Sequence, residues 1–141
     1  MSTIFTKILA GEVPASFVYR DDEVAAFMDI QPVNPGHVLV IPIAPIEYFY
    51  ELDDETCGHL FQVAKKTLKA IRDSEIPAEG INLFLADGAS AGQETAHVHL
   101  HIFPRFQDDG FELKFAERYF QLPSRTDLDA VAYQIRQFLK L

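Results

Sequence analysis

The segment His97-Val98-His99-Leu100-His101-Ile102-Phe103 constrains the fold most, because polar and apolar residues alternate along it. Alternation with a period of two predicts a β-strand whose side chains point to its two faces in turn. The three imidazoles then share one face, and Val98, Leu100 and Ile102 share the other. We expect the apolar face to enter the core and the imidazole face to line a cleft or meet solvent.

Hydrophobic spacing along the rest of the chain predicts further strands and helices. The helices predicted are a short one over Thr3–Ala10, a long one that Asp53 or Asp54 caps and that ends before Pro77, and a final one that Thr126 opens. The other predicted strands cover Ser16–Arg20, Glu23–Asp29, His37–Pro42 and Gly80–Asp87. Neighbouring strands followed by one long helix fit an antiparallel sheet of about five strands with helices packed on it, an α+β fold.

Composition limits the class of protein and of partner. A chain of 141 residues with 48% hydrophobic and 23% charged residues is one globular domain, not a disordered or membrane protein. Its 12 basic and 21 acidic residues give a formal charge of -9, so we expect no nucleic-acid partner and no membrane partner. An anionic ligand must therefore be held by local groups.

The predicted location is the cytoplasm. The single cysteine, Cys57, cannot form an internal disulfide, which favours a reducing compartment. No run approaches the roughly 20 apolar residues of a membrane span. The segment Met1–Phe5 lacks the basic and long apolar regions of a signal peptide.

Two chemistries use a row of histidines of this kind. A His-x-His pair on a strand is part of a metal site, and zinc needs three or four ligands, with these candidates to complete the set: His37, His59, Cys57 and Glu94. The other chemistry is covalent: a neutral imidazole attacks phosphorus, and the phosphoramidate is hydrolysed in a second step. The small residues of Gly88–Gln93 let backbone amides approach a phosphate, which favours the second chemistry.

The segment Ala91–Phe103, in which histidines alternate with hydrophobic residues after Gly-Gln, resembles the signature of the histidine-triad (HIT) family. Four other segments occur in the order and spacing typical of HIT proteins: Ile4–Ile8, Gly11–Ala15, Phe27–Ile30 and Pro35–Pro42. The resemblance covers about residues 3–106. It implies a single HIT-like domain over 1–141, with a core over about 3–106 and a C-terminal extension with a helix over about 111–141, and a homodimer.

The resemblance also implies an activity. It is that of a nucleotide hydrolase or transferase acting at the α-phosphate of nucleoside phosphoramidates or dinucleoside polyphosphates, with a purine nucleotide as substrate and without a metal or cofactor. His99 matches the family's nucleophile, His101 and His97 match the flanking residues that orient it and contact the phosphate, and His37 matches a fourth histidine.

The nucleotide-binding residues follow from the same resemblance. The residues that match the base pocket are Phe5, Ile8, Phe27 and Ile30; Asp29 matches the residue that binds the ribose hydroxyls; and the phosphate loop is matched by Gly92, Gln93 and the backbone of Glu94. From the residues alone, Phe5, Ile8 and Phe27 are equally well interpreted as ordinary core residues. Asp29 is equally a turn cap.

The chain departs from the family pattern at several positions. Some HIT proteins begin with a zinc-binding Cys-x-x-Cys, but Thr3 and Thr6 stand here, so we expect no metal and expect His59 to be a surface or packing residue. Glu94 stands where a hydroxyl residue is common, and we expect its carboxylate to point away from phosphate. Arg105 is interpreted as a surface residue. A metal-binding protein and a non-catalytic nucleotide-binding module remain alternatives to the enzyme.

Overall fold

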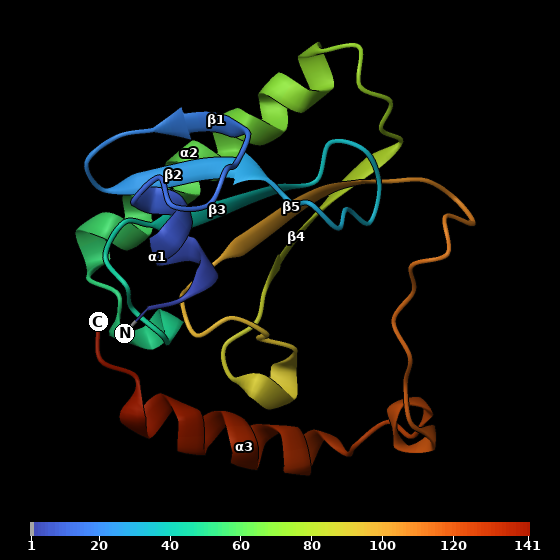
Figure 1. Cartoon of the computed structure of the whole chain (residues 1–141). Helices are drawn as coiled ribbons and strands as arrows, with labels where there is room; N and C mark the ends of the chain where they lie inside the picture. Colours follow the sequence, from blue (N-terminus) through green and yellow to red (C-terminus); the bar gives the residue numbers. More distant parts are fainter. Residues whose placement is uncertain (1) are drawn as a thin grey trace. The chain divides into compact units, whose positions relative to one another are not determined.

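A computed structural model describes residues 2–141 (Figure 1), and Met1, the first residue of the predicted domain 1–141, lies outside the described residues. The chain forms two compact units, one that ends at Asp109 and one over Gly110–Leu141. Elements of the first unit are, in order, α1 (Ile4–Leu9), β1 (Phe17–Arg20), β2 (Val24–Met28), β3 (Val38–Pro42), η1 (Phe49–Glu51), α2 (Asp54–Asp73), β4 (Gly80–Leu85), η2 (Ala89–Ala91) and β5 (Leu100–Arg105).

The five strands form one antiparallel sheet in the order β1-β2-β3-β5-β4, which confirms the predicted fold class. The strand of the histidine row lies later in the chain than predicted, since β5 covers Leu100–Arg105 and not His97–Phe103. The reason is that the Val98 amide donates to the Ile46 carbonyl at 2.8 Å and so bonds outside β3. The register pairs Leu39 of β3 with His101 of β5.

Alternate residues of the strands build two separate cores, one on each face of the sheet. On one face α2 packs its buried stripe, which includes Leu60, Ala64 and Ile71, against β-strand residues that include Val40 and Ile102. On the other face, Phe5 and Ile8 of α1 pack against four strand residues, namely Ala25, Phe27, Leu39 and Ile41. His101 is the register partner of Leu39, so it projects from the face that carries α1.

Two threonine hydroxyl groups cap the N-terminus of α1. The Thr6 amide donates to the Thr3 hydroxyl at 3.3 Å, and the Thr3 amide donates to the Thr6 hydroxyl at 2.8 Å, which is a reciprocal capping box. Thr3 and Thr6 therefore cap the N-terminus of α1.

The second unit contains η3 (Glu117–Phe120) and α3 (Arg125–Phe138). Ser124 caps α3, so the helix begins one residue before the predicted Thr126. Its apolar side chains Leu128, Val131, Ile135 and Phe138 are exposed. The single domain over 1–141 stays a prediction. Within residues 2–141, no helix has both the length and the apolar character that crossing a membrane requires.

We predict that Gly36→Ala lowers the free energy of unfolding by about 2 kcal/mol, because Gly36 has a φ of +100° and an added Cβ would lie 2.9 Å from Ile76 Cγ2 and 3.1 Å from Pro104 Cγ. Urea unfolding measures the change. Gly58→Ala is the matched control, since that glycine lies within α2 with open space around it, and alanine there raises stability by roughly 0.5–1 kcal/mol. Equal stability of Gly36→Ala and the wild type would contradict the conformational argument.

Candidate functional site

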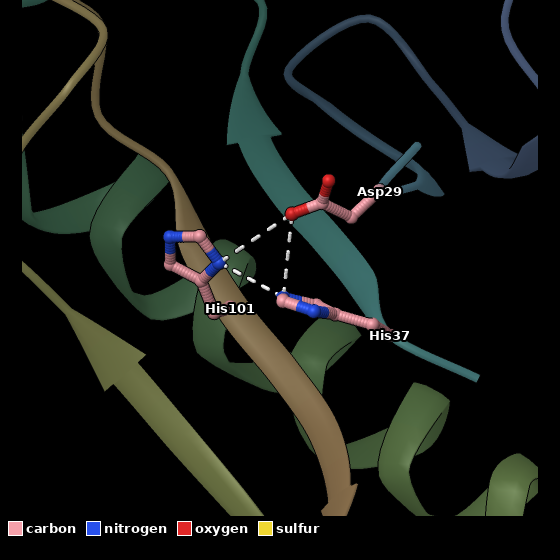
Figure 2. A group of neighbouring side chains, drawn as sticks. All are labelled: Asp29, His37 and His101. Carbon is pink, nitrogen blue, oxygen red and sulfur yellow. Dashed lines mark hydrogen bonds and ion pairs between the residues drawn. The ribbon is translucent and has the colours of Figure 1, made fainter. Parts of the chain in front are cut away.

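Three adjacent strands bring Asp29, His37 and His101 together on the face of the sheet that carries α1. His37 comes directly before β3 and Asp29 directly after β2, and the Asp29 amide donates to the His37 carbonyl at 3.0 Å. His37 Nε2 lies 2.9 Å from His101 Nδ1 and 3.5 Å from Asp29 Oδ2 (Figure 2). His101 Nδ1 lies 4.0 Å from the same carboxylate oxygen. The fourth histidine is thus hydrogen-bonded to the last member of the triad.

His97 and His99 are buried, unlike the predicted imidazole face that meets a cleft or solvent. His97 is 0% exposed and His99 is 6% exposed, and the Phe5 ring packs edge-on against both, with centroid separations of 5.6 and 5.1 Å. His101, with a side chain 21% exposed, is the most accessible of the three. The prediction was wrong for the first two because α1 covers this end of the row. The apolar face was predicted correctly, since Val98, Leu100 and Ile102 are buried.

Hydrogen bonds define which ring nitrogen of His99 carries the proton. Its Nδ1 lies 2.7 Å from the His97 carbonyl oxygen, which can only accept. In the neutral imidazole the proton is therefore on Nδ1, and Nε2 has an unshared electron pair. His97 Nε2 likewise donates to the Pro42 carbonyl at 2.8 Å, which leaves its buried Nδ1 without a hydrogen-bond partner among residues 2–141.

Burial favours the neutral form of three of the histidines, namely His37, His97 and His101. Desolvation, with smaller contributions from His99 and His37, lowers the pKa of His101 to about 4. Desolvation also lowers the pKa of His37, although Asp29 opposes it, and lowers the pKa of His97. These three imidazoles are therefore neutral near pH 7, and a neutral imidazole can donate one hydrogen bond and accept another.

Asp29 has a different partner for each carboxylate oxygen. Its Oδ1 accepts from the Gln31 amide at 2.8 Å, so it caps the turn after β2. Its Oδ2 faces the imidazole pair. The turn-capping interpretation is thus correct, and it leaves the second oxygen directed at the site.

The residues that match a base pocket divide into two groups. Phe5, Ile8 and Phe27 lie in one buried cluster, and the two phenylalanine rings pack edge to face at 5.7 Å. Ile30 is 94% exposed and is not part of that cluster. The structure therefore groups three of the four predicted side chains in one cluster, of which Phe5 contacts His97 and His99, and leaves the fourth exposed.

The loop before the triad is held together by Gln93. Its side-chain oxygen accepts from the Gly88 amide at 2.7 Å, and its amide group donates to the Glu47 carbonyl at 2.7 Å. The backbone amides of Gly92 and Gln93 donate to carbonyls of Ala89 and Gly88 within the same loop. Glu94 is exposed. Two of the three predicted phosphate-loop residues, Gly92 and Gln93, thus use their backbone amides for hydrogen bonds within the loop.

Among the described residues, one group of three potential metal ligands has its ligand atoms within 4.8 Å of one another, and it consists of Asp29, His37 and His101. A histidine that binds a metal donates its second ring N–H to an acceptor. His37 Nδ1 instead accepts from the Val33 amide at 3.0 Å, so the proton occupies Nε2, the atom that a metal would need. The geometry does not fit a metal. The other candidate zinc ligands, Cys57, His59 and Glu94, lie outside this group. His59 instead forms a hydrogen bond with Asp21 at 2.5 Å.

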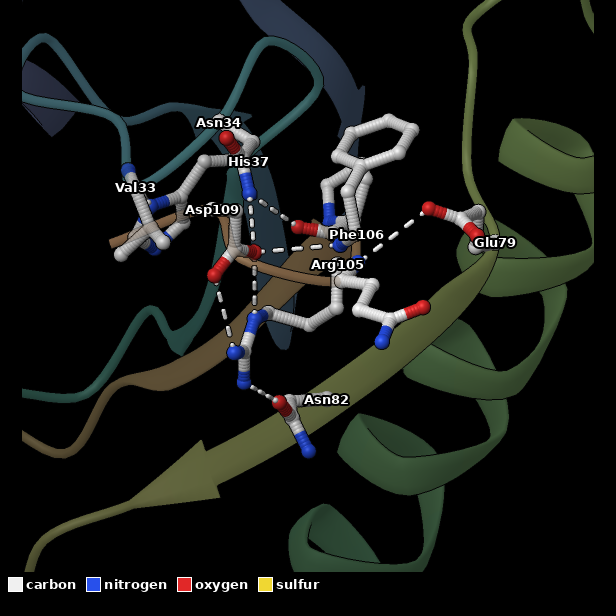
Figure 3. Close-up of polar contacts among 10 residues, drawn as sticks. Val33, Asn34, His37, Glu79, Asn82, Arg105, Phe106 and Asp109 are labelled. Carbon is white, nitrogen blue, oxygen red and sulfur yellow. Dashed lines mark hydrogen bonds and ion pairs between the residues drawn. The ribbon is translucent and has the colours of Figure 1, made fainter. Parts of the chain in front are cut away.

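Sequence reasoning missed a network behind the site (Figure 3). Arg105, interpreted as a surface residue, donates to Asp109 from Nε at 2.7 Å and from a terminal nitrogen at 3.0 Å. Asn34 donates to the same carboxylate at 2.8 Å. The contact spans 75 residues of sequence, and no pattern in the sequence indicates it.

Comparisons with known proteins agree with this architecture. The HIT domain model matches residues 10–108. An uncharacterized HIT-like protein of Methanocaldococcus jannaschii is 43% identical over 94% of this chain and 98% of its own length. The adenosine 5'-monophosphoramidase of Schizosaccharomyces pombe is 38% identical over 74% of this chain and 75% of its own. The crystal structure of a HIT family protein from Bacillus subtilis superimposes with a TM-score of 0.89 and 38% identity, covering 100% of this chain and 99% of that one.

The fold and the site define a histidine-triad protein. The chain belongs to the HIT family, as its resemblance to the family signature predicted.

Proposed function

We propose that this protein is a nucleotide hydrolase or transferase that cleaves at the α-phosphate of nucleoside phosphoramidates or dinucleoside polyphosphates through a nucleotidyl-histidine intermediate. The observation that carries the proposal is the hydrogen bond from His99 Nδ1 to the His97 carbonyl, because it leaves the Nε2 electron pair available for attack. The phosphoramidase relative supports the same reaction class.

In the first step, the His99 Nε2 electron pair forms a bond to the α-phosphorus, while the bond from phosphorus to the leaving amine or phosphate breaks. The leaving group departs with the bonding electrons and takes a proton from solvent. In the second step, the water oxygen forms a bond to phosphorus while the bond from phosphorus to His99 Nε2 breaks, and this releases the nucleoside monophosphate. The water's proton goes to solvent, and His99 returns to its neutral state.

The other residues act by binding. His101 and His97 flank the nucleophile, and His37 supports His101 through their 2.9 Å hydrogen bond. We assign the apolar cluster of Phe5, Ile8 and Phe27, in which Phe5 contacts His97 and His99, to the base, and the carboxylate of Asp29 to the ribose hydroxyls. An apolar wall forms few hydrogen bonds with the edges of a base, so we expect modest discrimination between bases. The expected substrate is the purine nucleotide that the family resemblance implies.

The experiment that tests this function measures AMP release from an adenosine phosphoramidate and from a diadenosine polyphosphate, in EDTA and with added zinc. We expect AMP from at least one substrate at the same rate in EDTA, because the histidines act without metal. Activity that appears only with zinc would support the metal-binding alternative. Tight nucleotide binding without AMP release would support the non-catalytic module.

The homodimer, which the family resemblance implies, and the cytoplasmic location, which the single cysteine favours, remain predictions. Light scattering of the purified chain tests the first. A mass of about twice 15.9 kDa is expected.

A further inference from the structure

The buried carboxylate of Asp109 is the acceptor shared by Asn34 and Arg105. The side chain of Asp109 is 5% exposed, and its Oδ2 accepts from Arg105, Asn34 and the Phe106 amide at 2.7, 2.8 and 3.1 Å (Figure 3). Charge-assisted bonds of this kind are stronger and more directional than neutral ones. The carboxylate therefore fixes the position of the Asn34 side chain.

Asn34 in turn holds the turn that precedes β3. Its side-chain amide also donates to the Pro104 carbonyl at 2.9 Å, and its own carbonyl accepts from the His37 amide at 3.2 Å. The preceding residue, Val33, donates its backbone N–H to His37 Nδ1 at 3.0 Å. The position of the Val33 amide thus depends on a turn that Asp109 anchors from the end of β5.

This amide determines where two protons lie. Because a backbone N–H only donates, His37 Nδ1 must be unprotonated, and the proton of neutral His37 is on Nε2. His37 Nε2 then donates to His101 Nδ1 at 2.9 Å. Neutral His101 therefore carries its own proton on Nε2, the nitrogen that points away from His37 (Figure 2). The Val33 amide, acting through His37, thus makes His101 Nε2 a hydrogen-bond donor.

We propose that Asn34 and Asp109 are positioning residues for the nucleotidyl transfer: they hold the Val33 amide against His37 and thereby keep the proton of His101 on Nε2, where it donates to a phosphate oxygen. The inference rests on the proposed function. It assigns to Arg105 a place in the support of the site and not a contact with substrate.

The test compares the wild type with Asn34→Ala, with Asp109→Asn and with the control Asp108→Asn. Asp108 is exposed and has a φ of 60°, which asparagine tolerates. Imidazole nitrogen NMR at pH 7 without substrate assigns the proton of each ring. We expect Nε2–H for His37 and His101 in the wild type and the control, and a mixture of tautomers for both rings in Asn34→Ala and Asp109→Asn. His99 serves as the internal reference, since its Nδ1–H bond to the His97 carbonyl is unaffected.

The kinetic arm measures AMP release. We expect kcat to fall about 10-fold in both variants while KM changes less than about twofold, because a misdirected hydrogen bond weakens the transition state more than the bound substrate. The control keeps the wild-type rate.

Two results would overturn the inference: a proton on Nδ1 of His101 in the wild type, or wild-type tautomers in Asn34→Ala and Asp109→Asn, whatever their rates. If the wild type releases no AMP, the proposed function fails while the NMR arm still decides the positions of the protons. If Asp109→Asn does not fold, Asn34→Ala decides, because its side chain lies in a turn and leaves the pair of Arg105 with Asp109 in place.

Discussion

His99→Gly is expected to reduce AMP release at least about 10³-fold with the fold intact, because the electron pair that forms the intermediate is removed. His99 is 6% exposed, so the smaller residue leaves a cavity and lowers stability as well. Activity must therefore be measured on protein whose circular dichroism matches the wild type. Initial rates of AMP release at saturating substrate give the effect.

The matched control for this prediction is His59→Ala. His59 Nε2 also donates one short hydrogen bond, to the Asp21 carboxylate at 2.5 Å, but it lies on α2, which covers the opposite face of the sheet. We expect its rate to stay within about twofold of the wild type, since it contacts neither substrate nor the other imidazoles. A similar loss of rate in both variants would mean that loss of stability, and not loss of the nucleophile, explains the result for His99.

Acidification from pH 7 to pH 4 is expected to destabilise the folded protein by about 3 kcal/mol through His101 alone. Burial lowers the pKa of His101 from 6.5 to about 4, so below pH 6.5 the unfolded chain binds a proton that the folded chain does not. Stability is therefore lost as the pH falls through this window. His37 and His97, whose pKa values burial also lowers, add to the same trend.

Carboxylates act in a different pH range, which allows the two effects to be separated. Burial raises the pKa of Asp21, but hydrogen bonds that include those from His59 and Tyr19 outweigh this and hold it below its ordinary value of 3.8. The stability that Asp21 contributes is lost only below that pH. Urea unfolding at a series of pH values measures the trend, and His101→Gln should make it shallower between pH 6.5 and 4. An unchanged slope in that variant would contradict the assignment.

Much of the fold follows from periodicity. The alternation of Val98, Leu100 and Ile102 correctly placed them in the core, and the apolar spacing after Asp53 predicted α2. Periodicity could not place the start of β5, because the backbone at Val98 bonds to the Ile46 carbonyl and not to a strand. It also could not show that α1 would bury His97 and His99, since that depends on the packing of Phe5, more than 90 residues earlier in the chain.

The candidate site was predicted less completely than the fold. The family resemblance identified His37 and Asp29, and the sheet register explains why they meet His101. The network of Asn34, Arg105 and Asp109 was missed because its bonds join a turn to the end of β5 across 75 residues. Side-chain contacts at that separation leave no periodic pattern in a single sequence.

The measurement that tests the covalent mechanism most directly is intact-protein mass spectrometry within seconds of mixing with an adenosine phosphoramidate in EDTA. We expect the wild type to gain the mass of one adenylyl group, located at His99 by fragmentation, and His99→Gly to gain none. An adduct at another residue, or rapid AMP release by the wild type with no adduct at any time, would contradict the nucleotidyl-histidine intermediate.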